Sequence, residues 1–167
     1  MRGRTVLTVV LLLMVAVVVQ TTLFGRIPLV TPDLVSLVVI MLCLTRIRPE
    51  LILAIAFTSG LIVDLLGSSV LGLRAVVFTT VAYLGLRTRD RAEIGRVAVA
   101  LWAGALTLVG IVLLIVIGTL FGQSSLLGED TFSRVILVPL ANLAIAAAVA
   151  PLVVRLVDRD KTAFRYP

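Results

Sequence analysis

Histidine is absent from the 167 residues of this chain, and cysteine occurs once, as Cys43. Without histidine there is no imidazole acid–base chemistry and no histidine-ligated metal. One thiol can build neither a disulfide framework nor a thiolate metal site. The sequence also has no phosphate-binding GxxxxGKS/T loop and no GxSxG nucleophile motif. These absences predict a protein that is not an enzyme and that holds no metal or cofactor.

Charged and aromatic side chains are also scarce. Charged residues make up 14% of the chain and aromatic residues 5%, whereas 60% of residues are hydrophobic and the mean hydropathy is +1.21. A soluble domain of this length has no core large enough to hide so much apolar surface. The net charge of +6 raises the question of nucleic acid, but stacking aromatics are few and the basic residues form no single stripe. We therefore expect an integral membrane protein that contacts anionic lipid and no nucleic acid.

The basic residues fall in alternate gaps between long apolar runs. Twelve lie before the first run or after the second, fourth and sixth runs, whereas the other gaps hold only Arg26 and Arg134, and Arg74 alone falls inside a run. The twelve are Arg2, Arg4, Arg46, Arg48, Arg87, Arg89, Arg91, Arg96, Arg155, Arg159, Lys161 and Arg165. Because cytoplasmic loops of membrane proteins carry the excess of Lys and Arg, this distribution predicts that both termini lie in the cytoplasm.

The apolar runs predict an all-α fold, a single bundle of about six transmembrane helices that occupies residues 1–167. The predicted spans are about 5–24, 32–45, 49–66, 70–86, 97–121 and 135–157. The first run is too long for a secretory signal and no cleavage site follows it, so it reads as an uncleaved anchor helix. The second run is only about 20 Å long as a helix. It must therefore be tilted, extended by its flanks, or placed where the bilayer thins.

Prolines mark the helix starts and interrupt the last span. Pro32 with Asp33, and Pro49 with the following glutamate, are typical of a first helical turn, where proline fits and a carboxylate favours the helix dipole. Pro139 and Pro151 lie inside the sixth span and are expected to break it.

Asp64 and Arg74 are the clearest charged residues within the predicted spans. Asp64 lies near the outer end of the third span and Arg74 near the outer start of the fourth, at similar depth on either side of a Gly-Ser-Ser turn. An ion pair between them is geometrically plausible, and a charge without a partner in hydrocarbon is costly. The pair is either a structural clasp or a binding determinant. Gly60 and Gly72, next to these charges, are expected to allow close helix packing.

Other polar residues gather toward the same outer half. Asn142, in the sixth span, is expected to hydrogen-bond across helices or to a carbonyl that Pro139 leaves unpaired, and Gln20 ends the first span. Gln20 forms an outer polar cluster with Thr21, Thr22, Asp33, Asp64, Arg74 and Arg134, and this cluster is the place to look for specific recognition.

The order and spacing of several short motifs resemble the rod shape-determining MreD family along nearly the whole chain. The motifs are Gln20-Thr-Thr-Leu, Pro32-Asp33-Leu34, Gly60-Leu-Ile-Val-Asp64-Leu-Leu, Leu71-Gly72-Leu73, Tyr83-Leu-Gly85-Leu-Arg87, and Pro139-x-x-Asn142 with a later Pro151. Arg74 departs from the pattern, since histidine or a neutral residue is expected there.

The resemblance implies a non-enzymatic scaffold or regulator of cell elongation in the bacterial cytoplasmic membrane. It implies MreC as partner, and through it MreB filaments, the glycosyltransferase RodA and a class B penicillin-binding protein of peptidoglycan synthesis. It also implies a fold like that of the substrate-binding S components of energy-coupling factor vitamin transporters.

Two other functions fit the same size and span count. An S component of a vitamin transporter needs small residues on its first helix, whereas this helix is bulky, and the outer cluster has few aromatics. A proton-coupled carrier would use Asp64, but a carboxylate paired with Arg74 makes a poor proton relay. The MreD-like scaffold is the preferred reading.

Overall fold

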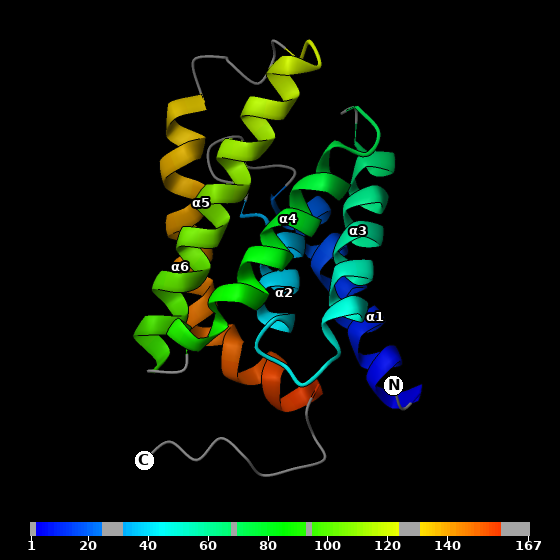
Figure 1. The fold of residues 1–167 in the computed structure, drawn as a ribbon, viewed down its shortest axis with the longest axis vertical. Helices are drawn as coiled ribbons and strands as arrows, with labels where there is room; N and C mark the ends of the chain where they lie inside the picture. The colour runs from blue at the N-terminus through cyan, green and yellow to red at the C-terminus, as the bar shows by residue number, and fades with distance from the viewer. Residues whose placement is uncertain (1–2, 25–31, 68–69, 93–94, 124–130, 158–167) are drawn as a thin grey trace.

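The apolar runs of the sequence fold into helices arranged as one bundle (Figure 1). The computed structural model describes residues 3–24, 32–67, 70–92, 95–123 and 131–157. Helix α1 (Gly3–Val19) continues into a π-helical turn, η1 (Gln20–Phe24). The other helices are α2 (Leu34–Leu42), α3 (Pro49–Leu66), α4 (Leu73–Thr88), α5 (Arg96–Leu120) and α6 (Thr131–Val157), with a 3₁₀ turn η2 (Arg89–Ala92) after α4. The described residues contain no strand, so the predicted all-α class is confirmed.

Four of the described helices are long and apolar enough to cross a membrane. These segments are Thr5–Thr22, Pro49–Leu66, Val97–Leu120 and Val135–Val157. The outward face of α1 shows how apolar the surface is: Leu7, Leu11, Met14, Val15 and Val18 are each more than half exposed. A continuous apolar surface of this kind is what lipid covers in a membrane protein.

Helix α2 lies at the centre of the bundle and is buried on every side. Figure 1 shows it among the longer helices, and it packs against α1, α3, α4, α5 and α6. Every residue from Val35 to Leu42 is buried, as expected of a helix that is apolar all round. Its nine residues span only about 14 Å. Protein rather than lipid therefore covers this segment. That the whole 32–45 region crosses the membrane stays a prediction.

Helices α3 and α4 form a close hairpin. Helix α3 begins at Pro49, in the first helical position, and ends at Leu66. A Cβ added to Gly60 would lie 2.6 Å from the backbone N and Cα of Ala75 and from the carbonyl oxygen of Arg74. The two backbones are therefore in contact at this glycine, and no side chain fits between them.

Helices α5 and α6 form the second hairpin. Helix α6 runs without interruption through Pro139 and Pro151, so the expectation that these prolines break it is wrong. Prolines are tolerated within membrane helices because neighbouring helices and local adjustments satisfy the backbone groups that they free. At the hairpin contact, a Cβ added to Gly104 would lie 3.2 Å from the side chain of Leu143.

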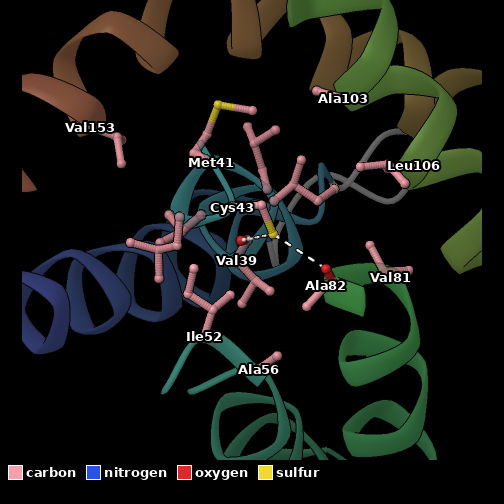
Figure 2. Close-up of a cluster of buried hydrophobic side chains, with 14 of the residues drawn as sticks. Val39, Met41, Cys43, Ile52, Ala56, Val81, Ala82, Ala103, Leu106 and Val153 are labelled. Atoms are coloured by element: carbon pink, nitrogen blue, oxygen red, sulfur yellow. Dashed lines mark hydrogen bonds between the residues drawn. The ribbon is translucent and has the colours of Figure 1, made fainter. Parts of the chain in front are cut away.

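The C-terminal end of α2 lies in an apolar cluster (Figure 2). The sulfur of Cys43 lies 3.5 Å from the carbonyl oxygen of Val39 and 3.6 Å from that of Ala82, on α4. Ile52 and Leu106 bring α3 and α5 into the same cluster. Apolar packing therefore surrounds the C-terminal end of α2, whereas the opposite end of α2 is held by polar groups.

Candidate functional site

The N-terminus of α2 begins inside the protein, so its first N–H groups need partners there. Asp33 is the N-cap, and its Oδ1 accepts a hydrogen bond from the N–H of Ser36 at 3.1 Å. Gln20, at the end of the first helix, accepts one from the N–H of Val35 through Oε1 at 3.3 Å. The N–H of the first helical residue donates to the carbonyl of Pro32 at 3.1 Å. The helix start is therefore closed by groups of the chain itself.

Asp64 closes the start of α4 in the same manner, although it belongs to α3. Its Oδ2 accepts hydrogen bonds from the backbone N–H of Gly72 at 2.9 Å and of Arg74 at 3.0 Å. Gly72 is the N-cap and has a φ of 91°, a left-handed conformation that glycine adopts without strain. Asp64 is only 2% exposed. Its carboxylate thus accepts hydrogen bonds from buried backbone N–H groups and is stabilised by the positive end of the α4 dipole.

Arg74 lies between two carboxylates and links the α3–α4 hairpin to α2. Its Nε is 4.0 Å from Oδ1 of Asp64, and its Nη1 is 4.0 Å from Oδ2 of Asp33. The side chains of Arg74 and Asp33 are 29% and 23% exposed, whereas that of Asp64 is fully buried. The exposed part of the site is therefore the Arg74–Asp33 pair.

Asn142 connects the same point to α5 and α6. Its Nδ2 donates to the carbonyl oxygen of Asp33 at 3.3 Å and to Oγ1 of Thr107 at 3.2 Å. The hydroxyl of Thr107 donates to the carbonyl of Ala103, so its oxygen accepts from Asn142, as the carbonyl oxygen of Asp33 does. The NH₂ group of Asn142 must therefore face both oxygens. Oδ1 of Asn142 is buried and has no hydrogen-bond partner.

The contacts of Thr107 place this site near mid-depth of the bundle. Thr107 lies 11 positions after Arg96, the first residue of α5, and 13 positions before Leu120, the last. One asparagine side chain joins this midpoint to the backbone of Asp33. That Asp33 lies toward the outer side of a membrane stays a prediction.

We call Gln20, Asp33, Asp64, Arg74, Thr107 and Asn142 the polar network. Five of these residues were singled out from the sequence, and the structure brings all five together. Thr107 was missed, and its only signal is a hydroxyl within an otherwise apolar run. The remaining predicted residues, Pro32, Gly60, Gly72, Pro139 and Pro151, lie on or next to the helices that carry the network. Arg26 and the side chain of Arg134 lie outside the described part of the chain.

The chemistry of the network is hydrogen bonding and ion pairing. It offers carboxylates, amides and one guanidinium, and no thiol or imidazole. Within the described residues, no group of three or more His, Cys, Asp or Glu side chains could hold a metal ion. The arrangement suits the positioning of helices and the recognition of a polar group.

An all-helical bundle with four helices of membrane-spanning length and a buried polar network defines a membrane protein of the helical class. A family model described as rod shape-determining protein MreD matches residues 1–159. This chain belongs to the MreD family, which ties it to the determination of rod shape and to the cell wall. The comparisons with curated proteins and with solved structures gave no match. The likeness to S components therefore stays an expectation.

Proposed function

We propose that this chain is a non-enzymatic scaffold of the bacterial cell-elongation machinery that acts with MreC in the cytoplasmic membrane. The observation that carries the proposal is the family match over residues 1–159, nearly the whole chain. Through MreC the scaffold would connect MreB, RodA and a class B penicillin-binding protein during peptidoglycan synthesis. Its six spans would leave both termini in the cytoplasm.

The position of the exposed arginines supports this orientation. Arg46 and Arg48 precede α3, and Arg87 and Arg155 lie in the last turns of α4 and α6; all four are exposed. In Figure 1 these helix ends lie at the same end of the bundle as the start of α1. The end of α3 and the start of α4 lie at the opposite end, so one end of the bundle is basic, as the cytoplasmic end should be.

The contact with MreC is proposed to lie at the outer end of the α3–α4 hairpin. Asp64 is buried and satisfies backbone groups, so its role is to hold the hairpin in shape. Arg74 is partly exposed, and its guanidinium forms only the two 4.0 Å ion pairs within the described residues. Arg74 is therefore the residue of this pair that can also bind a group of a partner.

The experiment is to purify the tagged protein from its native membrane in mild detergent and identify the co-purifying proteins by mass spectrometry. Recovery of MreC and the elongation synthases is expected. Recovery of a paired ATPase and a coupling membrane subunit would instead indicate an S component of a transporter and overturn the proposal.

Two arginine variants then separate partner binding from stability. Arg74→Gln removes the guanidinium but keeps the N–H that Asp64 caps, and the recovery of MreC, measured per amount of purified variant, should fall. Arg48→Gln makes the same change at the exposed basic end, and it should leave the recovery of MreC unchanged. Equal recovery from both variants would show that Arg74 does not bind MreC.

A further inference from the structure

The charged side chain of Asp33 lies deep in this bundle beside the guanidinium of Arg74, and both side chains are still partly exposed. Asp33 is joined through Asn142 to Thr107, at the midpoint of a helix whose 24-residue apolar segment is long enough to cross a membrane. Nevertheless, the side chain of Asp33 is 23% exposed, and that of Arg74 is 29% exposed. The question is which surroundings, lipid or water, these exposed atoms meet.

The packing around Asp33 argues against lipid. Helix α2 contacts all five longer helices, and the side chains that reach its N-terminus come from η1, α4 and α6. A charge that faced hydrocarbon at this depth would be strongly unfavourable, and such groups in membrane proteins face the protein interior or a water-filled space. The start of a helix inside the membrane is likewise tolerated where it is buried in protein or lines such a space.

Asn142 provides a second observation that points to water. Its Oδ1 is buried without a partner, next to the amide nitrogen that binds the backbone of Asp33. Buried acceptors of this kind are usually satisfied by ordered water.

We infer that water enters from the outer side as far as Asp33 and Gln20, so that the polar network is an outward-facing site for a small hydrophilic group with positive charge. The positive charge follows from the described groups, which are the two carboxylates of Asp33 and Asp64 against the one guanidinium of Arg74. This inference rests on the orientation proposed above, because the outer side is the side of the Asp64–Gly72 turn.

Cysteine accessibility tests the inference, because the chain has one natural cysteine, and it is buried. In a Cys43→Ala background, Asp33→Cys and Gln20→Cys are treated from the outer side of cells with charged, membrane-impermeant methanethiosulfonates. Gln20→Cys keeps all three charges and the N-cap, so it reports even if Asp33→Cys fails to accumulate. The matched control is Leu108→Cys, next to Thr107 at the same depth, with its side chain 41% exposed on the outward face of α5.

Both test cysteines should react, and the cationic reagent should modify Gln20→Cys faster than the anionic one. Leu108→Cys should react at roughly one tenth of the rate of the test cysteines or slower, because the reactive thiolate forms in water and not in an apolar environment. If the test cysteines react no faster than Leu108→Cys, the site faces lipid or is closed and the inference is wrong. Reaction only in inside-out vesicles would overturn outward access, and equal rates for the two reagents would overturn the preference for positive charge.

Two further cysteines report the orientation separately. Glu50→Cys, exposed at the start of α3, should react only in inside-out vesicles, and Gln123→Cys, after the end of α5, only from the outer side. If Glu50→Cys reacts only from the outer side and Gln123→Cys only in inside-out vesicles, the proposed topology is wrong. The water access of Gln20→Cys is still measured against Leu108→Cys in that case.

Discussion

The two helix hairpins of this protein are held together by different means. In the α3–α4 hairpin the backbones touch at Gly60, and the carboxylate of Asp64 binds the N–H groups that begin α4. In the α5–α6 hairpin a flexible leucine side chain covers Gly104, and the polar contact is the amide of Asn142 with Thr107. Backbone atoms cannot move aside, whereas side chains can adopt other rotamers. The first hairpin should therefore tolerate far less change than the second.

The largest effect is expected from Asp64→Ala. The change leaves the N–H groups of Gly72 and Arg74 unpaired and removes one of the two carboxylates beside the guanidinium. Breaking a buried pair from one side costs about 3–5 kcal/mol, and partial exposure of Arg74 puts the expected loss near the lower value. Thermal unfolding in detergent should show the fall in stability directly.

Asp64→Asn is the matched control for that change. Its remaining oxygen can still accept from Gly72 or Arg74, so its unfolding temperature should lie between those of the wild type and Asp64→Ala. If Asp64→Ala unfolds at the wild-type temperature, the carboxylate does not hold the hairpin.

Gly60→Ala should be the next most damaging change. A Cβ here would lie 2.6 Å from backbone atoms of α4, so the two helices must move apart, at a cost of about 1–3 kcal/mol. Gly104→Ala meets only the side chain of Leu143 at 3.2 Å, which can shift by a few tenths of an ångström. Because alanine favours a helix interior over glycine by about 1 kcal/mol, Gly104→Ala should be close to neutral.

The two glycine variants are best compared in one unfolding experiment in the same detergent. Gly60→Ala should unfold at a clearly lower temperature than Gly104→Ala. Equal unfolding temperatures would mean that the backbone contact in the first hairpin does not limit its packing.

The sequence predicted the parts of this structure that depend on local chemistry. Proline at the start of α3, aspartate at the N-cap of α2, and two charges on either side of a tight turn are each visible within a few residues. The sequence is less informative where the partner of a segment decides its structure. An apolar run reads the same whether lipid or protein covers it, so the predicted span 32–45 did not reveal that protein covers its nine-residue helix α2.

The candidate site shows the same limit. Asn142 and Asp33 are 109 positions apart, and no local pattern indicates that an amide on the last helix binds the cap of the second. Nor does the sequence reveal that the carboxylate of Asp64 serves backbone N–H groups as well as the guanidinium. The first fact depends on where α2 begins in the bundle, and the second on how closely α3 and α4 pack.

The smallest effect should come from Asn142→Leu, although this residue is fully buried. The carbonyl of Asp33 also accepts from the N–H of Leu37 at 2.9 Å, and the hydroxyl of Thr107 keeps its bond to Ala103, so neither loses its last partner. The substitution also removes the unpaired Oδ1, and a side chain of similar size fills the space. Replacing a polar group while its neighbours stay satisfied is nearly neutral, so the expected change is within about 1 kcal/mol.

The same isosteric change in the other hairpin, Asp64→Leu, should remain strongly destabilising, because the N–H groups at the start of α4 have no such second acceptor among the described contacts. Thermal unfolding of the two variants side by side measures the difference. A large loss for Asn142→Leu would show that the second hairpin also depends on its polar contact. The two hairpins would then differ only at their glycines.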